Sequence, residues 1–288
     1  MSFSGEVKEE LAKHISPARH CQIAELAAIM NYCGHYGRDT EGNYIIGFQT
    51  ENEAARRKGF TLLKKTYNID TDVSISEEEI AGILQKLGNL DEPVSQLLIK
   101  NSCCQRAFLR GAFLSIGSMS DPQKSYHLEF VCTDEDKARQ LQSVIQGFDI
   151  DAKIVTRKKY YVVYLKEGSS IVDLLNICEA HVALMKLENL RILKEMRNSI
   201  NRRVNCEAAN ISKTVNAATR QIEDIEYIRD HYGFQNLPES LRQMAEVRLD
   251  NQDATLKELG QFLNPPVGKS GVNHRLRKLS ELADRLRT

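Results

Sequence analysis

The chain has 288 residues, of which 42% are hydrophobic and 27% are charged, as expected for a folded protein of two or three domains. Lys plus Arg equal Asp plus Glu at 39 each. No run approaches the roughly 20 apolar residues of a membrane span, and the seven cysteines have no CxxC pairing, so neither a disulfide framework nor a zinc ribbon is predicted. We expect a cytoplasmic protein with reduced, mostly buried thiols.

The first half of the chain predicts two passes of one αβ unit. The first pass has a short leading helix at 6–13, a buried helix at 21–33 that stops at Gly34, a strand at 44–50 and a helix at 51–67. The second has a helix from 103 to 116 that stops at Gly117, a strand at 126–132 and a helix at 134–146.

The two passes align at a nearly constant separation. LAAIMNYCG begins at Leu26 and LRGAFLSIG at Leu109, 83 residues later, and the pair Ala55 and Arg56 recurs as Ala138 and Arg139. An internal repeat of this kind predicts two similar lobes related by a pseudo-dyad, with the repeated helices in contact.

The copies then diverge. The second continues into a β-hairpin with its turn at RKK, residues 157–159, and a helix at 170–178. The first appears one strand short, and its residues 71–100 hold six acids and two bases. We expect an acidic loop at SISEEE, where the second copy has its hairpin.

The remaining chain reads as helical. A long amphipathic helix is predicted at 182–198, a polar, Ala-rich connector at 201–230, and a boundary near 232–238. Three short helices follow: one from Pro238, one capped by Thr255 with Glu258 as a capping box, and one capped by Ser270. The predicted domains are a first lobe (1–100), a second lobe (101–185), a helical linker (186–235) and a helical C-terminal domain (236–288).

The last helix is the clearest binding signal. Residues 268–288 carry six bases and two acids, and Val272, Leu276 and Leu279 form an apolar stripe. This order of helices is typical of a helix-turn-helix, which places donors near the start of its second helix in the DNA major groove. The candidate DNA-binding residues are Lys269, Ser270, Asn273, His274, Arg275, Arg277 and Lys278. The alternative is a solvated basic helix that closes a bundle.

Two further basic segments are candidates for contact with the DNA backbone. They are Arg202, Arg203 and Lys213 in the connector, and Arg157, Lys158 and Lys159 in the hairpin turn. A purely structural connector and an ordinary exposed turn remain the alternatives.

The repeated helices resemble the LAGLIDADG motif of homing endonucleases. The small third residues, Ala28 and Gly111, suit close approach of two such helices. In active members the eighth residue is a metal-binding acid, whereas here it is Cys33 and Ile116, so the resemblance implies that cleavage is lost. Asp39, Glu41 and Asp121 lie in nearby polar loops, and a relocated metal site there is disfavoured. We expect no metal, no cofactor and ordinary roles for His127, His181, Cys103 and Cys104.

The whole chain resembles the WhiA family of bacterial regulators. The resemblance rests on CCQRAFLRGAFLSIGSMSDPQKSYHLEF, NRRVNCEAANISKTVNAA and LGQFLNPPVGKSGVNHRLRKL. It implies an α+β two-lobe LAGLIDADG homing-endonuclease-like N-terminal domain and a separate all-α helix-turn-helix C-terminal domain.

The function that the resemblance implies is regulation through double-stranded DNA, not enzymatic catalysis. It concerns transcription, cell division, chromosome segregation and, in sporulating relatives, sporulation, in a nucleoid-associated protein. A partner regulator or RNA polymerase is a further expected partner, with no membrane contact, and one chain already supplies two-fold symmetry, which favours a monomer. Two alternatives stay open: a residual metal-dependent endonuclease, and an N-terminal domain that serves as a protein-interaction platform.

Overall fold

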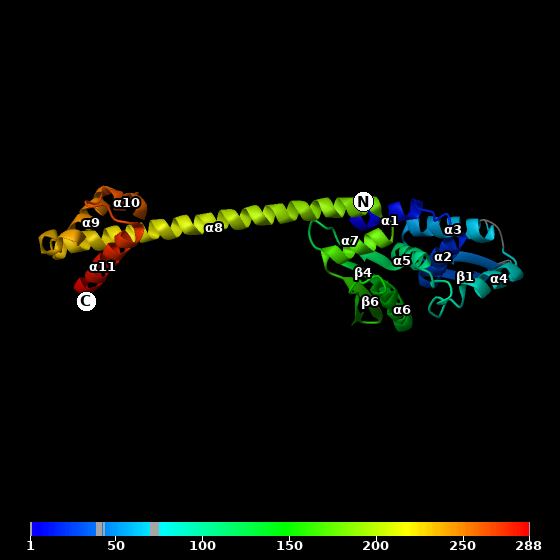
Figure 1. Cartoon of the computed structure of the whole chain (residues 1–288). Helices are drawn as coiled ribbons and strands as arrows, with labels where there is room; N and C mark the ends of the chain where they lie inside the picture. Colours follow the sequence, from blue (N-terminus) through cyan, green and yellow to red (C-terminus); the bar gives the residue numbers. More distant parts are fainter. Residues whose placement is uncertain (1, 39–41, 43, 70–74, 288) are drawn as a thin grey trace. The chain divides into compact units, whose positions relative to one another are not determined.

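The computed structural model describes residues 2–38, 42, 44–69 and 75–287. These residues form two compact units, one that ends at Glu195 and one that begins at Met196. Figure 1 labels the helices and strands along the chain. Within the described residues, no helix is both long enough and apolar enough to cross a membrane.

The first lobe of the N-terminal unit is mostly helical. Its elements are α1 (Phe3–Lys13), α2 (Arg19–Cys33), β1 (Gly34–Arg38), β2 (Tyr44–Phe48), α3 (Glu53–Tyr67) and α4 (Glu77–Leu87). The predicted helices and the strand near 44 are confirmed. Strand β1 was not predicted: Gly34 ends α2 in an extended conformation, and the chain continues directly into a strand antiparallel to β2.

The acids of the segment SISEEE lie in a helix and not in the expected loop, so that prediction was wrong for the described residues 75–79. Ser76 caps α4 and forms a capping box with Glu79, which places Glu77 and Glu78 in the first helical turn. Acids are favourable there because the helix dipole is positive at its N-terminus.

The second lobe carries the larger sheet. Its elements are α5 (Ser102–Ile116), β3 (Gly117–Met119), β4 (Leu128–Cys132), α6 (Glu135–Gln146), β5 (Lys153–Arg157), β6 (Tyr160–Leu165) and α7 (Gly168–Ile177). The sheet order is β3-β4-β6-β5, with all neighbours antiparallel. The predicted hairpin is confirmed, with its turn at Lys158 and Lys159. Among the described residues the first lobe has the two strands of one ribbon, so it does have fewer strands than the second.

Helices α2 and α5 pack against each other at the centre of this unit (Figure 1). A Cβ atom on Gly111 would lie 2.5 Å from the Glu25 carbonyl oxygen and 2.9 Å from the Ala28 Cβ. The close approach predicted from the small residues at the third motif positions is therefore confirmed. Only glycine allows the two backbones to lie this close.

A buried ionic cluster lies beside the same contact. The Glu25 carboxylate, fully buried, lies 3.1 Å from the Lys58 ammonium and 3.2 Å from the Arg110 guanidinium. Arg110 also contacts the Glu179 carboxylate at 2.5 Å. These charges come from α2, α3, α5 and the end of α7, so they join both lobes through buried electrostatic contacts.

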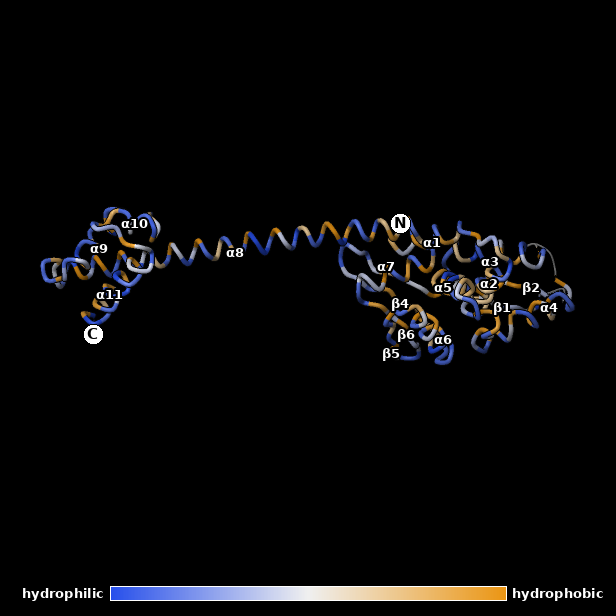
Figure 2. The backbone as a smooth tube through the Cα atoms, viewed as in Figure 1, coloured by the Kyte–Doolittle hydropathy of each residue, from blue (hydrophilic) through white to orange (hydrophobic). Residues whose placement is uncertain are grey.

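Helix α8 (His181–His231) is one continuous helix of 51 residues. The predicted helix at 182–198 and the polar connector at 201–230, part of the expected helical linker, form this one helix without a break. The physical reason is composition, since no Gly or Pro interrupts residues 181–231. Figure 2 shows hydrophobic and hydrophilic residues alternating along α8.

The C-terminal unit contains the end of α8, a 3₁₀ turn (Phe234–Asn236), α9 (Glu239–Asp250), α10 (Leu256–Phe262) and α11 (Lys269–Arg287). Its core joins Ile225 and Ile228 of α8 to Met244, Leu259 and Leu276. The Asp224 carboxylate, also buried, pairs with Arg287 at 2.7 Å. Packing in this unit therefore includes the last turns of α8, ahead of the expected boundary at residue 236.

Candidate nucleic-acid interface

Helices α10 and α11 are joined by a tight turn. Thr255 and Glu258 form the predicted capping box at the start of α10. The Val267 N–H donates to the Gly260 carbonyl at 2.9 Å, and a Cβ on Gly260 would lie only 2.1 Å from the Val267 oxygen. Glycine at this position thus lets the turn fold back onto α10, as a helix-turn-helix requires.

The apolar stripe of α11 holds it in this unit. Val272, Leu276 and Leu279 are all buried, as predicted, and Ala283 extends the stripe. The helix begins at Lys269, and the Val272 N–H donates to the Gly268 carbonyl at 3.1 Å. The prediction that Ser270 caps the helix was therefore wrong: Ser270 lies inside the first turn, with its side chain exposed.

The seven candidate DNA-binding residues of α11 differ in how accessible they are. Lys269, Ser270, Asn273, His274, Arg277 and Lys278 are exposed, whereas Arg275 is half-buried. The Arg275 guanidinium lies 3.5 Å from the Ser240 carbonyl of α9, and Arg277 pairs with Glu281 at 3.1 Å. The first two turns of α11 consequently carry the most accessible polar side chains.

A groove of about 780 Å³ adjoins the start of α11. Its walls come from α8, from the α9–α10 connection and from α11. One acid, Asp253, lines the groove, and its basic and amide side chains are Lys213, Gln221, Arg248, Gln252, Lys257, Lys269 and Asn273. Arg248 is buried and donates to the Ala254 carbonyl at 2.9 Å, so its role is structural. Lys213, Lys257 and Lys269 are exposed, and none of them has an ion-pair partner among the described residues.

The groove brings together residues that are far apart in the sequence. Lys213, predicted as a backbone contact, lies with the α11 residues Lys269 and Asn273. Lys257 was not predicted as a DNA contact. It lies two residues after the cap Thr255, in the first turn of α10, and its position at the start of this helix was the available signal. Arg202 and Arg203 are exposed on α8 but do not line the groove.

The basic hairpin turn belongs to the N-terminal unit and is partly neutralised. Arg157 pairs with Glu129 at 3.0 Å. The same Glu129 carboxylate also contacts the His127 Nε2 at 3.0 Å. The Lys159 ammonium lies 5.4 Å from the centroid of the Tyr160 ring. Lys158 is exposed at the tip.

The positions that correspond to nuclease acids are unsuited to a hard cation. Cys33 is buried, its thiol donates to the Ile29 carbonyl at 3.3 Å, and burial raises the pKa of that thiol. Ile116 packs against the core. Burial also lowers the pKa of the neighbouring Lys8 to about 8, while Cys33 opposes that shift. The two motif positions thus hold a thiol, with a lysine as its neighbour, and an alkyl group, where Mg²⁺ binding requires carboxylate oxygens.

Other acids near the motif helices add no ligand set there. The Asp121 carboxylate accepts from the Gln123 N–H at 2.9 Å within its own loop, and Asp39 and Glu41 lie outside the described residues. In the described part of the chain, the one group of three or more His, Cys, Asp or Glu side chains with converging ligand atoms is His20, Cys21, Cys103 and Cys104.

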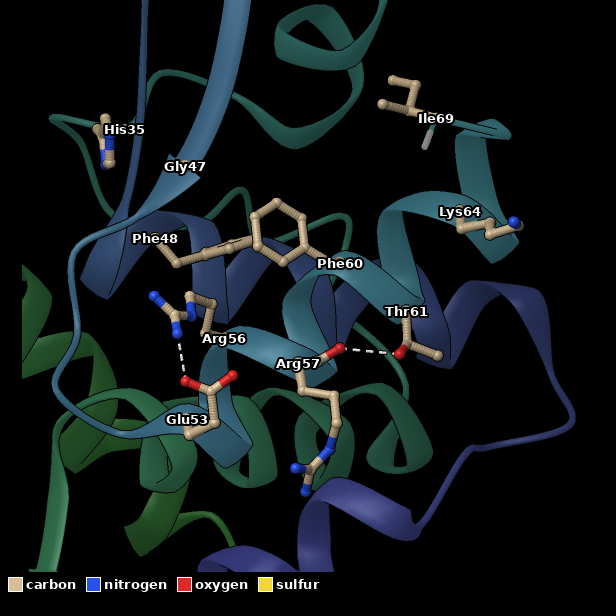
Figure 3. Close-up of a pocket in the computed structure, with 10 residues that line it drawn as sticks. All are labelled: His35, Gly47, Phe48, Glu53, Arg56, Arg57, Phe60, Thr61, Lys64 and Ile69. Carbon is tan, nitrogen blue, oxygen red and sulfur yellow. Dashed lines mark hydrogen bonds and ion pairs between the residues drawn. The ribbon is translucent and has the colours of Figure 1, made fainter. Parts of the chain in front are cut away.

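A second pocket, of about 710 Å³, lies between the β1–β2 ribbon and α3 (Figure 3). Its lining includes His35, Phe60, Arg56 and Arg57. Arg56 pairs with Glu53, and Arg57 pairs with Glu9 at 2.8 Å. Because these cations are already paired, this pocket provides weaker electrostatic attraction for an anionic ligand than the groove beside α11.

Comparison with known proteins agrees with this architecture. Residues 19–81 match the model of the WhiA N-terminal LAGLIDADG-like domain, residues 105–197 the WhiA LAGLIDADG-like domain, and residues 200–283 the WhiA C-terminal HTH domain. A "Probable cell division protein WhiA" of Lachnoclostridium phytofermentans is 54% identical, and the alignment covers 100% of both chains. The chain belongs to the WhiA family.

Other WhiA proteins extend this result. The relative of the same name from Alkaliphilus oremlandii is 49% identical over 99% of this chain and 98% of its own length. The crystal structure of full-length DUF199/WhiA from Thermatoga maritima has a TM-score of 0.59 and 29% identity, and the match covers 99% of each chain. The two-lobe LAGLIDADG-like fold followed by a helix-turn-helix domain is thus the WhiA architecture. The alignments with the first two relatives span 313 positions, more than the 288 residues here, so those relatives carry segments that this chain lacks.

Proposed function

We propose that this WhiA protein is a non-enzymatic, sequence-selective DNA-binding regulator of transcription, acting in cell division and chromosome segregation. The observation that carries the proposal is the basic groove at the start of α11, where three exposed lysines without ion-pair partners adjoin Asn273. The names of the relatives support the role in cell division, and the roles in transcription and chromosome segregation rest on the resemblance to the WhiA family. In sporulating relatives the same activity would serve sporulation genes.

The residues of the C-terminal unit suggest a division of roles. Asn273 and His274 lie in the first turns of α11, where side chains of a helix-turn-helix reach base edges. Lys213, Lys257 and Lys269 supply positive charge for phosphates, which fix the register of the protein on the duplex. The free N–H groups at the start of α11 provide further phosphate donors.

Arg277 and Arg275 have smaller proposed roles than the sequence suggested. Arg277 would first exchange its contact with Glu281 for a phosphate, and Arg275 would leave the Ser240 carbonyl. Each exchange offsets part of the gain from DNA contact. We therefore place the main determinants at Lys269 and Asn273.

Loss of DNA cleavage is the second part of the proposal. Phosphodiester hydrolysis with two metal ions requires carboxylate ligands beside the scissile phosphate. Cys33, Ile116 and Lys8 offer a neutral thiol, an alkyl group and an amine at the corresponding place. Incubation of the full chain with supercoiled DNA and Mg²⁺ or Mn²⁺ is expected to give no nicking, and nicking that Asp121→Asn removes would contradict this part.

DNA binding is tested by fluorescence anisotropy with the full chain and duplexes selected from a random pool. Log Kd is expected to rise linearly with log salt concentration, and Lys269→Ala should lower the slope by about 1 because one phosphate contact is lost. Asn273→Ala should reduce the preference for selected over random duplexes. Lys100→Ala, a matched exposed lysine in the N-terminal unit, serves as the control. Salt-independent binding, or equal effects of Lys100→Ala and Lys269→Ala, would overturn the proposal.

A further inference from the structure

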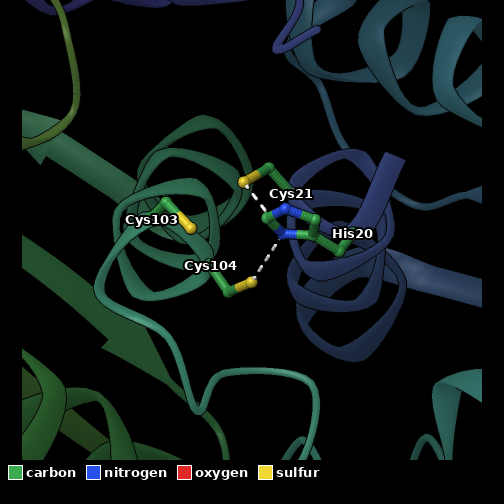
Figure 4. A group of neighbouring side chains, drawn as sticks. All are labelled: His20, Cys21, Cys103 and Cys104. Atoms are coloured by element: carbon green, nitrogen blue, oxygen red, sulfur yellow. Dashed lines mark hydrogen bonds between the residues drawn. The ribbon is translucent and has the colours of Figure 1, made fainter. Parts of the chain in front are cut away.

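Four metal-ligating side chains converge at the start of the two motif helices. His20 and Cys21 lie in the first turn of α2, and Cys103 and Cys104 in the first turn of α5. Their ligand atoms all lie within 4.8 Å of one another (Figure 4). Neither DNA contact nor the degenerate nuclease positions account for this cluster.

The cluster follows the internal repeat. His20 and Cys21 precede Cys103 and Cys104 by the same 83 residues that separate the two motifs, so each lobe supplies two ligands across the pseudo-dyad. Ala24 and Ala107, related by the same separation, pack with Cys21 and Cys104 as a small apolar cluster. Two helix starts are thus held together by equivalent residues of both copies.

We propose that His20, Cys21, Cys103 and Cys104 form a structural Zn²⁺ site that links the two lobes. Zinc in structural sites takes four ligands in a tetrahedron, with Zn–S of about 2.3 Å and Zn–N of about 2.0–2.1 Å, which places ligand atoms roughly 3.5–3.8 Å apart. The His20 Nδ1 lies 3.2 Å from the Cys104 Sγ and 3.4 Å from the Cys21 Sγ. These two distances need to lengthen by a few tenths of an ångström, and pairs as far apart as 4.8 Å would close by about 1 Å, to form the site.

The donor set selects zinc among the common metals. Thiolate and imidazole ligands disfavour Mg²⁺ and Ca²⁺, which bind oxygen. Iron–sulfur clusters mostly use four thiolates, whereas a Cys₃His set is a known structural zinc set. With four protein ligands there is no open position, so the site holds the fold and performs no catalysis.

Two of the thiols are shielded from solvent, since Cys21 and Cys104 are 4% and 3% exposed. Zn²⁺ binds the thiolate form of cysteine, so each cysteine that joins the site gives up its thiol proton to solvent as its Zn–S bond forms. The positive ends of α2 and α5 favour the negative charge of these ligands.

The site explains residues that spacing alone does not connect. From the sequence we expected no metal and ordinary roles for Cys103 and Cys104, because neither segment has a CxxC spacing of its own. The ligands instead come from two segments that the fold brings together. Cys103 and His20 are exposed, so the ion has a route from solvent.

The test uses the full chain, purified without chelators under reducing conditions, and elemental analysis for zinc. We expect about one Zn²⁺ per chain, near-complete loss in Cys104→Ser, and no change in Cys206→Ser or Cys132→Ser, whose thiols lie elsewhere. Reconstitution with Co²⁺ should give the intense visible bands of tetrahedral thiolate coordination. His20→Ala, an exposed change that leaves the core intact, should weaken Co²⁺ binding by at least about tenfold.

Three results would overturn the proposal. The first is reduced wild-type chain that binds neither Zn²⁺ nor Co²⁺. The second is equal metal content in Cys104→Ser, His20→Ala and the controls. The third is a disulfide between Cys21 and Cys103 or Cys104 in freshly isolated chain under non-reducing mass spectrometry, which would make the cluster a redox pair instead. If Cys104→Ser fails to fold, the His20→Ala cobalt titration decides.

Discussion

Replacing Gly111 by Ala tests whether the α2–α5 contact holds the N-terminal unit together. The added methyl would lie 2.5 Å from the Glu25 oxygen and 2.9 Å from the Ala28 Cβ. Carbon atoms in contact lie about 3.5–4.0 Å apart, so the helices must separate locally by roughly 0.5–1 Å. Neither a carbonyl oxygen nor a Cβ can rotate away, and the movement also disturbs Glu25 beside Lys58 and Arg110.

Two opposing effects set the expected change in folding stability for Gly111→Ala. Overpacking of this kind destabilises by about 1–3 kcal/mol, while Ala in place of Gly favours the helix by about 1 kcal/mol. Because the clashing atoms are fixed, we expect the upper part of that range and a net loss of about 1–2 kcal/mol. Gly82→Ala in α4 is the matched control, since a Cβ there meets no atom within 4 Å. It should instead stabilise by up to about 1 kcal/mol.

Hydrogen exchange followed by mass spectrometry measures the two variants in the full chain. Amides of α2 and α5 should exchange faster in Gly111→Ala, by about five- to thirtyfold for 1–2 kcal/mol, and those of α9 to α11 should be unchanged. Gly111→Ala as stable as the wild type, with Gly82→Ala behaving as expected, would refute the reasoning about close approach.

Three further predictions concern buried charge and a helix cap. Glu25→Gln leaves Lys58 and Arg110 without their shared carboxylate and should destabilise the N-terminal unit by about 3–5 kcal/mol in urea unfolding; a loss below 1 kcal/mol would contradict a buried ionic cluster. Burial lowers the pKa of Lys8 to about 8 from 10.5, so the unfolded chain binds more protons between these values and stability rises with pH there. From pH 8 to 9.5 the rise due to Lys8 should be about 1.5 kcal/mol and absent in Lys8→Met, and equal pH profiles would argue against it. Thr255→Ala removes the cap of α10 and should lower the stability of the C-terminal unit by about 1 kcal/mol, seen as faster exchange of α10 amides; unchanged exchange would show that the capping box is dispensable.

Local chemistry made several elements predictable. The capping box at Thr255, the glycine stop at Gly117 and the stripe of Val272 and Leu276 depend on residues a few positions apart, and each is present in the structure. The pairing of α2 with α5 followed from the internal repeat and the small residues at the contact. These features need no knowledge of distant contacts.

The extent of some elements was harder to predict than their presence. The polar, Ala-rich composition after residue 201 indicated a linker, and the absence of Gly and Pro allows this linker to continue α8 as one helix. Strands β1 and β3 are short, and each begins at the glycine that ends the preceding helix, so no alternating pattern marks them.

The remaining features of the site depend on contacts between elements that are far apart in the sequence. The pairing of Arg157 with Glu129, and the groove that joins Lys213 to Lys257 and Lys269, arise only when separate elements meet. The four-residue cluster at His20 is intermediate, because the 83-residue separation already relates its two halves.

The proposed role of the α11 surface is tested most directly by mapping bound sites across the genome in cells that produce either the wild-type chain or Asn273→Ala. The wild type should occupy discrete sites that share a sequence motif, close to genes of cell division and chromosome segregation. Asn273→Ala, at equal abundance, should lose most of those sites. An absence of enriched sites in the wild type, or an unchanged set of sites in the variant, would contradict sequence-selective binding through α11.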